Sequence, residues 1–108
     1  MKKIFKNIRL LFLSLGSVAY AQTVEPVMVN QGQLYILPST LVSTQFDFDN
    51  KASGVIFNDG EFQFYKNYNN DGLFTHSTNK TTGYTVFQGS QPQMIEGSQP
   101  SKHFDVLF

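Results

Sequence analysis

Short runs in which hydrophobic and polar residues alternate recur along most of the chain, separated by residues that favour turns. After the first 21 residues, no window shows the i, i+3, i+4, i+7 pattern of a capped amphipathic helix. Short strands at this spacing, with Pro, Asn, Asp or Gly between them, predict an all-β protein. We expect strands at 33–37, 40–43, 45–48, 55–57, 61–65, 73–75, 84–87, 94–95 and 103–108.

The tripeptide Asn-Asp-Gly occurs twice, as Asn58-Asp59-Gly60 and as Asn70-Asp71-Gly72. Asn and Asp tolerate left-handed backbone and bond neighbouring amides, and Gly adopts positive φ without steric cost. A catalytic carboxylate would need convergent partners, and the sequence offers none at either site. We therefore interpret both tripeptides as structural turns.

Two all-β architectures fit this turn pattern. Asp-Gly hairpins would give an antiparallel β-sandwich, whereas turn chemistry that recurs at fixed spacing is typical of a parallel β-solenoid. Gly-Ser-Gln-Pro also recurs, at 89–92 and 97–100. We predict a short-stranded parallel β-solenoid and keep the sandwich as the alternative. The last strand, 103–108, is apolar and uncapped, so we expect the solenoid to be incomplete there and to begin a longer protein.

The first 21 residues have the features of a secretory signal peptide. Residues 1–9 contain four basic residues and no acid, residues 10–18 are mostly apolar, and Ala19-Tyr20-Ala21 supplies a cleavage site. The apolar run is shorter than the roughly 20 residues that span a bilayer. We predict a signal peptide at 1–21, a solenoid-like segment at 22–108, no transmembrane segment after cleavage, and an extracellular or cell-surface location.

Charge and composition limit the kinds of partner that we expect for this chain. Four of the eight basic residues lie in the signal, so four remain against eight acidic residues and the mature segment carries a net charge of −4. Nucleic acid is therefore not an expected partner. The chain has no cysteine, so its stability must come from aromatic residues in the core, from backbone hydrogen bonding or from further chain. We expect that core to contain Phe46, Phe48, Phe57, Phe62, Phe64, Phe74, Phe87 and Phe104, with Tyr35, Tyr65, Tyr68 and Tyr84 partly outside.

The chemistry-bearing residues indicate a segment that is not an enzyme. Asp47 and Asp49 alternate with phenylalanines, as on a solvated strand face. The oxygen-rich run 67–72 resembles a calcium loop, but Thr78 stands where such a loop needs a bidentate Glu. His76 and His103 lack further ligands in the sequence. We predict no catalytic residue, no metal site and no cofactor.

One candidate binding site remains. Tyr65 and Tyr68, beside Asn67 and Asn69, could form a ligand-stacking platform for a sugar. The first hypothesis is an exported surface or structural segment with a role in extension, display or adhesion, whose partner would be a surface glycan or protein. The alternative is a secreted carbohydrate-binding β-sandwich module.

Several short runs of residues, taken in their order along the chain, resemble those of a known class of proteins. They are a lysine-rich signal, Gly32-Gln33-Leu34-Tyr35, Pro38-Ser39-Thr40-Leu41-Val42-Ser43, Phe48-Asp49-Asn50-Lys51, Asn58-Asp59-Gly60-Glu61, Tyr68-Asn69-Asn70-Asp71-Gly72, Thr82-Gly83-Tyr84-Thr85 and Phe104-Asp105-Val106-Leu107-Phe108. Together they resemble the N-terminal region of large adhesin-like exported surface proteins of the type IX secretion cargo kind. The resemblance implies a β-solenoid stalk or surface segment, exported with the help of a C-terminal sorting domain.

Overall fold

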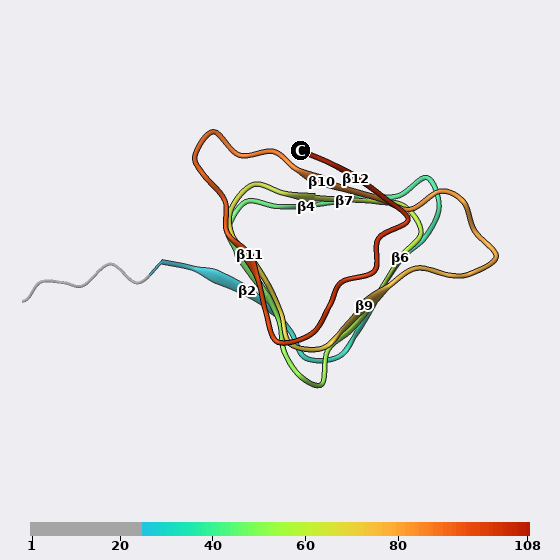
Figure 1. Ribbon diagram of the computed structural model, residues 1–108, viewed down its shortest axis with the longest axis horizontal. Coiled ribbons are helices and arrows are strands. Elements are labelled where there is room, and N and C mark those ends of the chain that lie inside the picture. Colours follow the sequence, from blue (N-terminus) through green and yellow to red (C-terminus); the bar gives the residue numbers. More distant parts are fainter. Residues whose placement is uncertain (1–24) are drawn as a thin grey trace, which may run out of the picture.

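The computed structural model describes residues 25–108, and the predicted signal peptide lies outside this part of the chain. Within it, eleven strands and no helix form three sheets (Figure 1). The first sheet contains β2 (Val27–Asn30), β5 (Asp47–Asn50), β8 (Tyr68–Asn70) and β11 (Ile95–Glu96). The second contains β3 (Gln33–Ile36), β6 (Val55–Asn58) and β9 (Leu73–Thr75). The third contains β4 (Leu41–Thr44), β7 (Glu61–Phe64), β10 (Tyr84–Phe87) and β12 (Asp105–Leu107).

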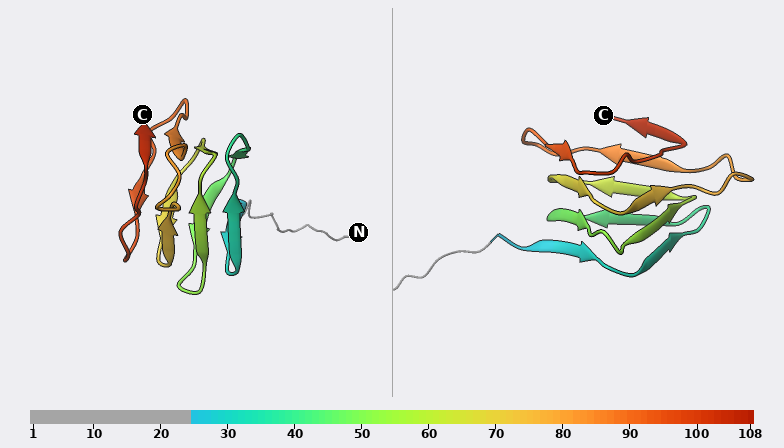
Figure 2. Two further views of the ribbon diagram at one scale, coloured as in Figure 1. Left: turned by 90° about the vertical axis from the view of Figure 1, so that its right-hand side faces the viewer. Right: turned by 60° about the horizontal axis from the view of Figure 1, so that its bottom comes forward.

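Every pair of neighbouring strands is parallel, and each strand from β5 onward pairs with one from the preceding coil. The chain visits the first, second and third sheets in turn, so the coils are roughly triangular in Figure 1 and stack on one another in Figure 2. The predicted parallel β-solenoid is confirmed, with about four turns. The antiparallel sandwich is wrong, because the Asp-Gly turns join strands of different sheets and form no hairpin.

Stacked aromatic rings fill the interior of the solenoid. The rings of Phe64 and Phe87 lie 5.3 Å apart at 19°, and those of Phe48 and Tyr68 lie 6.3 Å apart at 10°. Such pairs contribute about 0.5–1.5 kcal/mol each beyond the burial of their area. Because the chain has no disulfide, this column is a main source of its stability. The buried hydrophobic residues are Ile36, Phe48, Ile56, Phe62, Phe64, Tyr68, Phe74 and Phe87.

Four of the expected aromatic placements are wrong. Phe57, predicted to be in the core, takes an outward position of β6 and packs edge-on against Tyr35, with ring centroids 5.0 Å apart. Phe46 and Phe104, predicted to be in the core, are 44% and 46% exposed, whereas Tyr68, predicted to be partly outside, is 1% exposed. Phe46 lies in the corner before β5, and Phe104 precedes β12, so neither occupies an inward strand position. Tyr68 begins β8, a strand that the sequence pattern did not predict, and it points inward there.

Three asparagines, one per coil, form a ladder through the interior of the first corner. The side-chain amide of Asn30 donates to Oδ1 of Asn50 (2.9 Å), and that of Asn50 donates to Oδ1 of Asn70 (2.8 Å). The partners are 20 residues apart. Asn50 and Asn70 are fully or almost fully buried, so these bonds satisfy groups whose burial would otherwise be costly.

The two Asn-Asp-Gly tripeptides make the same local turn at two different corners. Oδ1 of Asn58 accepts from the backbone amide of Gly60, and Oδ1 of Asn70 accepts from that of Gly72, both at 3.2 Å. The glycine is needed because the preceding coil passes close by. A Cβ at Gly60 would lie 2.4 Å from the carbonyl oxygens of Leu37 and Thr40.

Replacing the middle of the ladder should be costly. We expect Asn50→Ala to lower the free energy of unfolding by about 2–3 kcal/mol, because it removes the buried hydrogen bonds that the Asn50 side chain makes with Asn30, with Asn70 and with the backbone carbonyl of Leu73. Asn79→Ala, at an exposed position in the loop between β9 and β10, is the control and should stay within about 0.5 kcal/mol of the parent. Urea unfolding at constant m-value measures both; equal losses would contradict a stabilising ladder.

The close approach at Gly60 gives a second test. Gly60→Ala should destabilise the protein by about 1–3 kcal/mol, because the new methyl group overlaps backbone that cannot move freely. Gly32→Ala is the matched control, since a Cβ there would meet no atom of the described residues within 4 Å. We expect that control to stay within about 1 kcal/mol of the parent. Thermal unfolding of the three proteins would reveal the difference, and an unaffected Gly60→Ala variant would argue against tight coil stacking.

Candidate ligand-binding surface

The outer face of the third sheet carries a row of side chains from successive coils. In β7, Phe62 and Phe64 point inward and are fully buried, so Glu61 and Gln63 point outward. The parallel register aligns the outward position of each strand with that of its neighbour. The resulting row is Leu41, Glu61, Tyr84 and Asp105.

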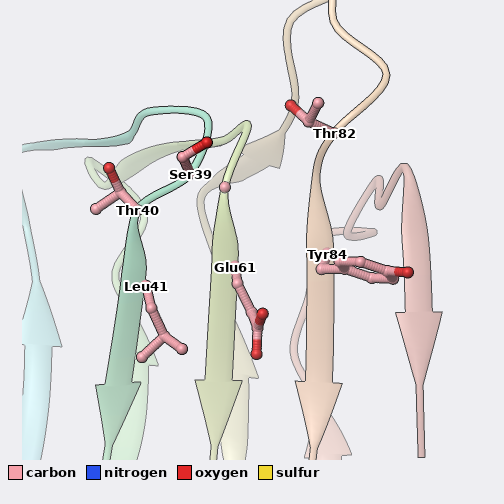
Figure 3. A pocket seen from close by; sticks show the side chains of 7 residues that line it. Ser39, Thr40, Leu41, Glu61, Thr82 and Tyr84 are labelled. Atoms are coloured by element: carbon pink, nitrogen blue, oxygen red, sulfur yellow. The ribbon is translucent and has the colours of Figure 1, made fainter.

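A surface pocket of about 300 Å³ lies over this row (Figure 3). Leu41 and Tyr84 are 56% and 43% exposed, and Glu61 projects between them. The side-chain amide of Gln63 donates to Oε2 of Glu61 at 2.5 Å, which holds the carboxylate in place. The lining residues are Ser39, Thr40, Leu41, Gly60, Glu61, Thr82 and Tyr84.

A smaller pocket of about 130 Å³ adjoins the first and shares Thr82 and Tyr84 with it. Its other lining residues are Thr81 and Gly83, just before β10, and Phe104 and Asp105 of the last coil, which contribute an exposed ring and a carboxylate. Tyr84 therefore borders both pockets. We call the two together the Tyr84 groove.

Hydrogen bonds within the protein fix one end of the groove. The hydroxyl of Thr82 donates to the backbone carbonyl of Asp59 (2.5 Å). The Asp59 carboxylate accepts from the backbone amide and the hydroxyl of Ser77, at 2.8 and 2.6 Å. The loop between β9 and β10 is thus tied to the corner of the preceding coil. On the opposite side Ser39 has φ 65°, a left-handed backbone conformation that non-glycine residues rarely adopt.

The structure does not bring the predicted platform residues together on one surface. The ring of Tyr68 is buried, and its hydroxyl lies 2.7 Å from Oγ of Ser101. This burial raises the pKa of the Tyr68 hydroxyl above its usual value. Tyr65 lies at a corner, where its hydroxyl accepts from Gln88 and its ring borders a separate pocket of about 330 Å³.

The acidic residues singled out in the sequence link one coil to the next. Asp47 accepts from the backbone amide of Asn67 (3.0 Å), and Asp49 accepts from the side chain of Asn69 (2.9 Å). Asp71 accepts from the backbone amide and the hydroxyl of Ser98, and these bonds hold the pKa of Asp71 below its usual range. Across residues 25–108, no group of three or more His, Asp or Glu side chains could hold a metal ion.

The two histidines contact different rings. The ring of His103 lies 4.9 Å from that of Phe74, and its Nδ1 lies 2.8 Å from Oγ1 of Thr85. His76 packs edge-on against Phe104 at 5.7 Å. Burial, with a smaller contribution from the charge of His76, lowers the pKa of His103 below its usual value.

Comparisons of the chain with models of known protein families, with curated proteins and with solved structures gave no match. Among the residues that the structure describes, no helix is long and apolar enough to cross a membrane.

The Tyr84 groove was missed in the sequence because its residues are far apart there. Tyr84 was expected to be partly outside, as it is, but nothing placed it beside Glu61. The signal was the similar alternation in 41–44, 61–64 and 84–87. Aligning those three runs as stacked strands would have put Leu41, Glu61 and Tyr84 in one row.

The lowered pKa of His103 predicts a pH-dependent stability. Below about pH 6.5 the His103 side chain takes up a proton in the unfolded chain, whereas burial opposes this protonation in the folded chain. The stability associated with neutral His103 is therefore fully present above that pH and is lost as the pH falls toward the lower pKa of the folded state. We expect the free energy of unfolding to decline from about pH 7 to about pH 5, and less steeply in His103→Gln. His76→Gln should keep most of the decline. Urea unfolding across this range tests it, and identical slopes in all three proteins would contradict the assignment.

Proposed function

We propose that this chain is a non-enzymatic, exported surface or structural segment whose role is extension, display or adhesion. The observation that best supports this proposal is that inward and outward side chains have different roles. Inward residues stack on their counterparts in the next coil, as in the Asn30, Asn50 and Asn70 ladder. The outward rows remain available for contact with a partner.

The solenoid architecture favours such a role. Each coil contacts only its neighbours, so a solenoid presents an extended lateral surface along its axis, which is how repeat proteins generally bind partners. Three polar side chains accept hydrogen bonds from backbone amides of the following coil; they belong to Asp59, Asn67 and Asp71. These polar groups are thereby occupied in holding the coils in register, which favours a scaffold over a reaction centre.

Export and a cell-surface location belong to the same proposal, and they depend on the signal peptide at 1–21 and on the resemblance to type IX secretion cargo. The alternative hypothesis was a carbohydrate-binding β-sandwich module, and the parallel sheets exclude the sandwich fold. Its carbohydrate-binding part has support from the Tyr84 groove.

Processing and location can be tested together in the native cell. We expect the mature N-terminus of the gene product to be Gln22, and an Ala21→Glu variant to retain the signal, because signal peptidase requires a small residue there. Protease added to intact cells should digest the wild-type product and spare a cytoplasmic control protein. An uncleaved, protease-protected product starting at Met1 would contradict the proposal.

A further inference from the structure

We propose that the Tyr84 groove binds a neutral carbohydrate chain lying along the solenoid axis. This deepens the proposed function and rests on it, since it names the ligand class that the displayed surface would recognise. The occupant is inferred from the chemistry, the charge and the spacing of the groove.

The groove combines apolar faces with hydrogen-bonding groups in the way that a sugar requires. A pyranose ring has a face of C–H groups and a rim of hydroxyls. The half-exposed ring of Tyr84 and the exposed side chain of Leu41 offer apolar contact. Between them, Glu61 offers carboxylate oxygens that accept hydrogen bonds from hydroxyls. The lining therefore mixes apolar and polar side chains, with Ser39 and Thr40 adding hydroxyls at the rim.

The charge of the groove selects against anionic ligands. Glu61 and Asp105 contribute carboxylates, and none of the described residues that line either pocket is lysine or arginine. Uronates, sialates and phosphates would therefore meet like charges with no compensating cation, which disfavours their binding. A neutral glycan avoids this repulsion and can use the carboxylates as acceptors.

The spacing of the row favours a chain over a single sugar. Neighbouring strands lie about 4.7–4.9 Å apart, and along the axis the row reads Leu41, Glu61, Tyr84 and Asp105. Apolar and acidic positions thus alternate over four coils. Beyond Tyr84, the second pocket repeats the pairing of an exposed ring with a carboxylate through Phe104 and Asp105. A linear oligosaccharide can contact both pockets at once.

The groove is also formed without a ligand. Gln63 positions Glu61, and the bonds from Ser77 and Thr82 to Asp59 fix the loop at one end. The left-handed Ser39 at the rim is a local strain of the kind that clusters at ligand sites. Groups held in place before binding lose less entropy on binding, which increases affinity.

The test uses the full gene product purified from its native cell on a printed panel of neutral hexose oligosaccharides and of uronate- and sialate-bearing ones. We expect binding to neutral members, weakened about tenfold or more by Tyr84→Ala. Glu61→Gln should weaken it to a smaller degree, because one acceptor oxygen remains. Tyr35→Ala is the matched control, since Tyr35 is 59% exposed on the outer face of the second sheet; it should change binding by less than about twofold. Circular dichroism checks that each variant is folded.

Equal losses in the Tyr84 and Tyr35 variants, binding restricted to acidic glycans, or no glycan binding would each overturn the inference. A Tyr65→Ala variant locates any binding that survives Tyr84→Ala, and loss only there would assign the ligand to the other pocket and reject the Tyr84 groove. The protease experiment on intact cells separates the two levels: a surface-exposed product that binds no glycan rejects the groove alone, whereas a protected cytoplasmic product rejects the proposed function.

Discussion

Parallel pairing of each strand with its counterpart one coil away is the constraint on which the rest of the structure depends. It places chemically equivalent positions directly above one another, so every inward side chain must pack against a residue of the same position. Asn50 meets Asn30 and Asn70, and Phe64 meets Phe87. The corners obey the same constraint, because backbone passes so close that a glycine such as Gly60 or Gly72 is required.

The candidate site lies where the repeat is interrupted. The first coils repeat every 20 residues, as the Asn30, Asn50 and Asn70 ladder shows, but the third coil carries a longer loop between β9 and β10. That loop projects beyond the regular corner and supplies Thr82 to the groove. Its bonds to Asp59 fix it to the coil below. The solenoid thus provides the flat row of outward residues, and the longer loop provides the wall that turns it into a pocket.

Local sequence chemistry was sufficient to predict the solenoid and most of its strands, because turn residues and alternation are local signals. It failed where a residue's environment is set by a distant coil. Tyr68-Asn69-Asn70 looked like a turn because asparagine is rare in strands, yet β8 is stabilised by stacking: Asn70 continues a ladder and Tyr68 packs on Phe48. The 20-residue spacing of the three asparagines was the available signal. The site depended likewise on inter-coil register, which no single run of residues encodes.

Stacking equivalent positions also limits which side chains can carry charge. An amide can both donate and accept, so asparagine can bond to its own kind in a buried column, whereas stacked carboxylates would repel one another. The acids within strands lie in outward rows, and there they are spaced. Asn69 separates Asp49 from Glu96, and Tyr84 separates Glu61 from Asp105. In these two rows a neutral residue stands between two acids, and the position between Glu61 and Asp105 holds an aromatic ring. The separation of like charges between neighbouring coils thus accompanies the alternating row on which recognition would depend.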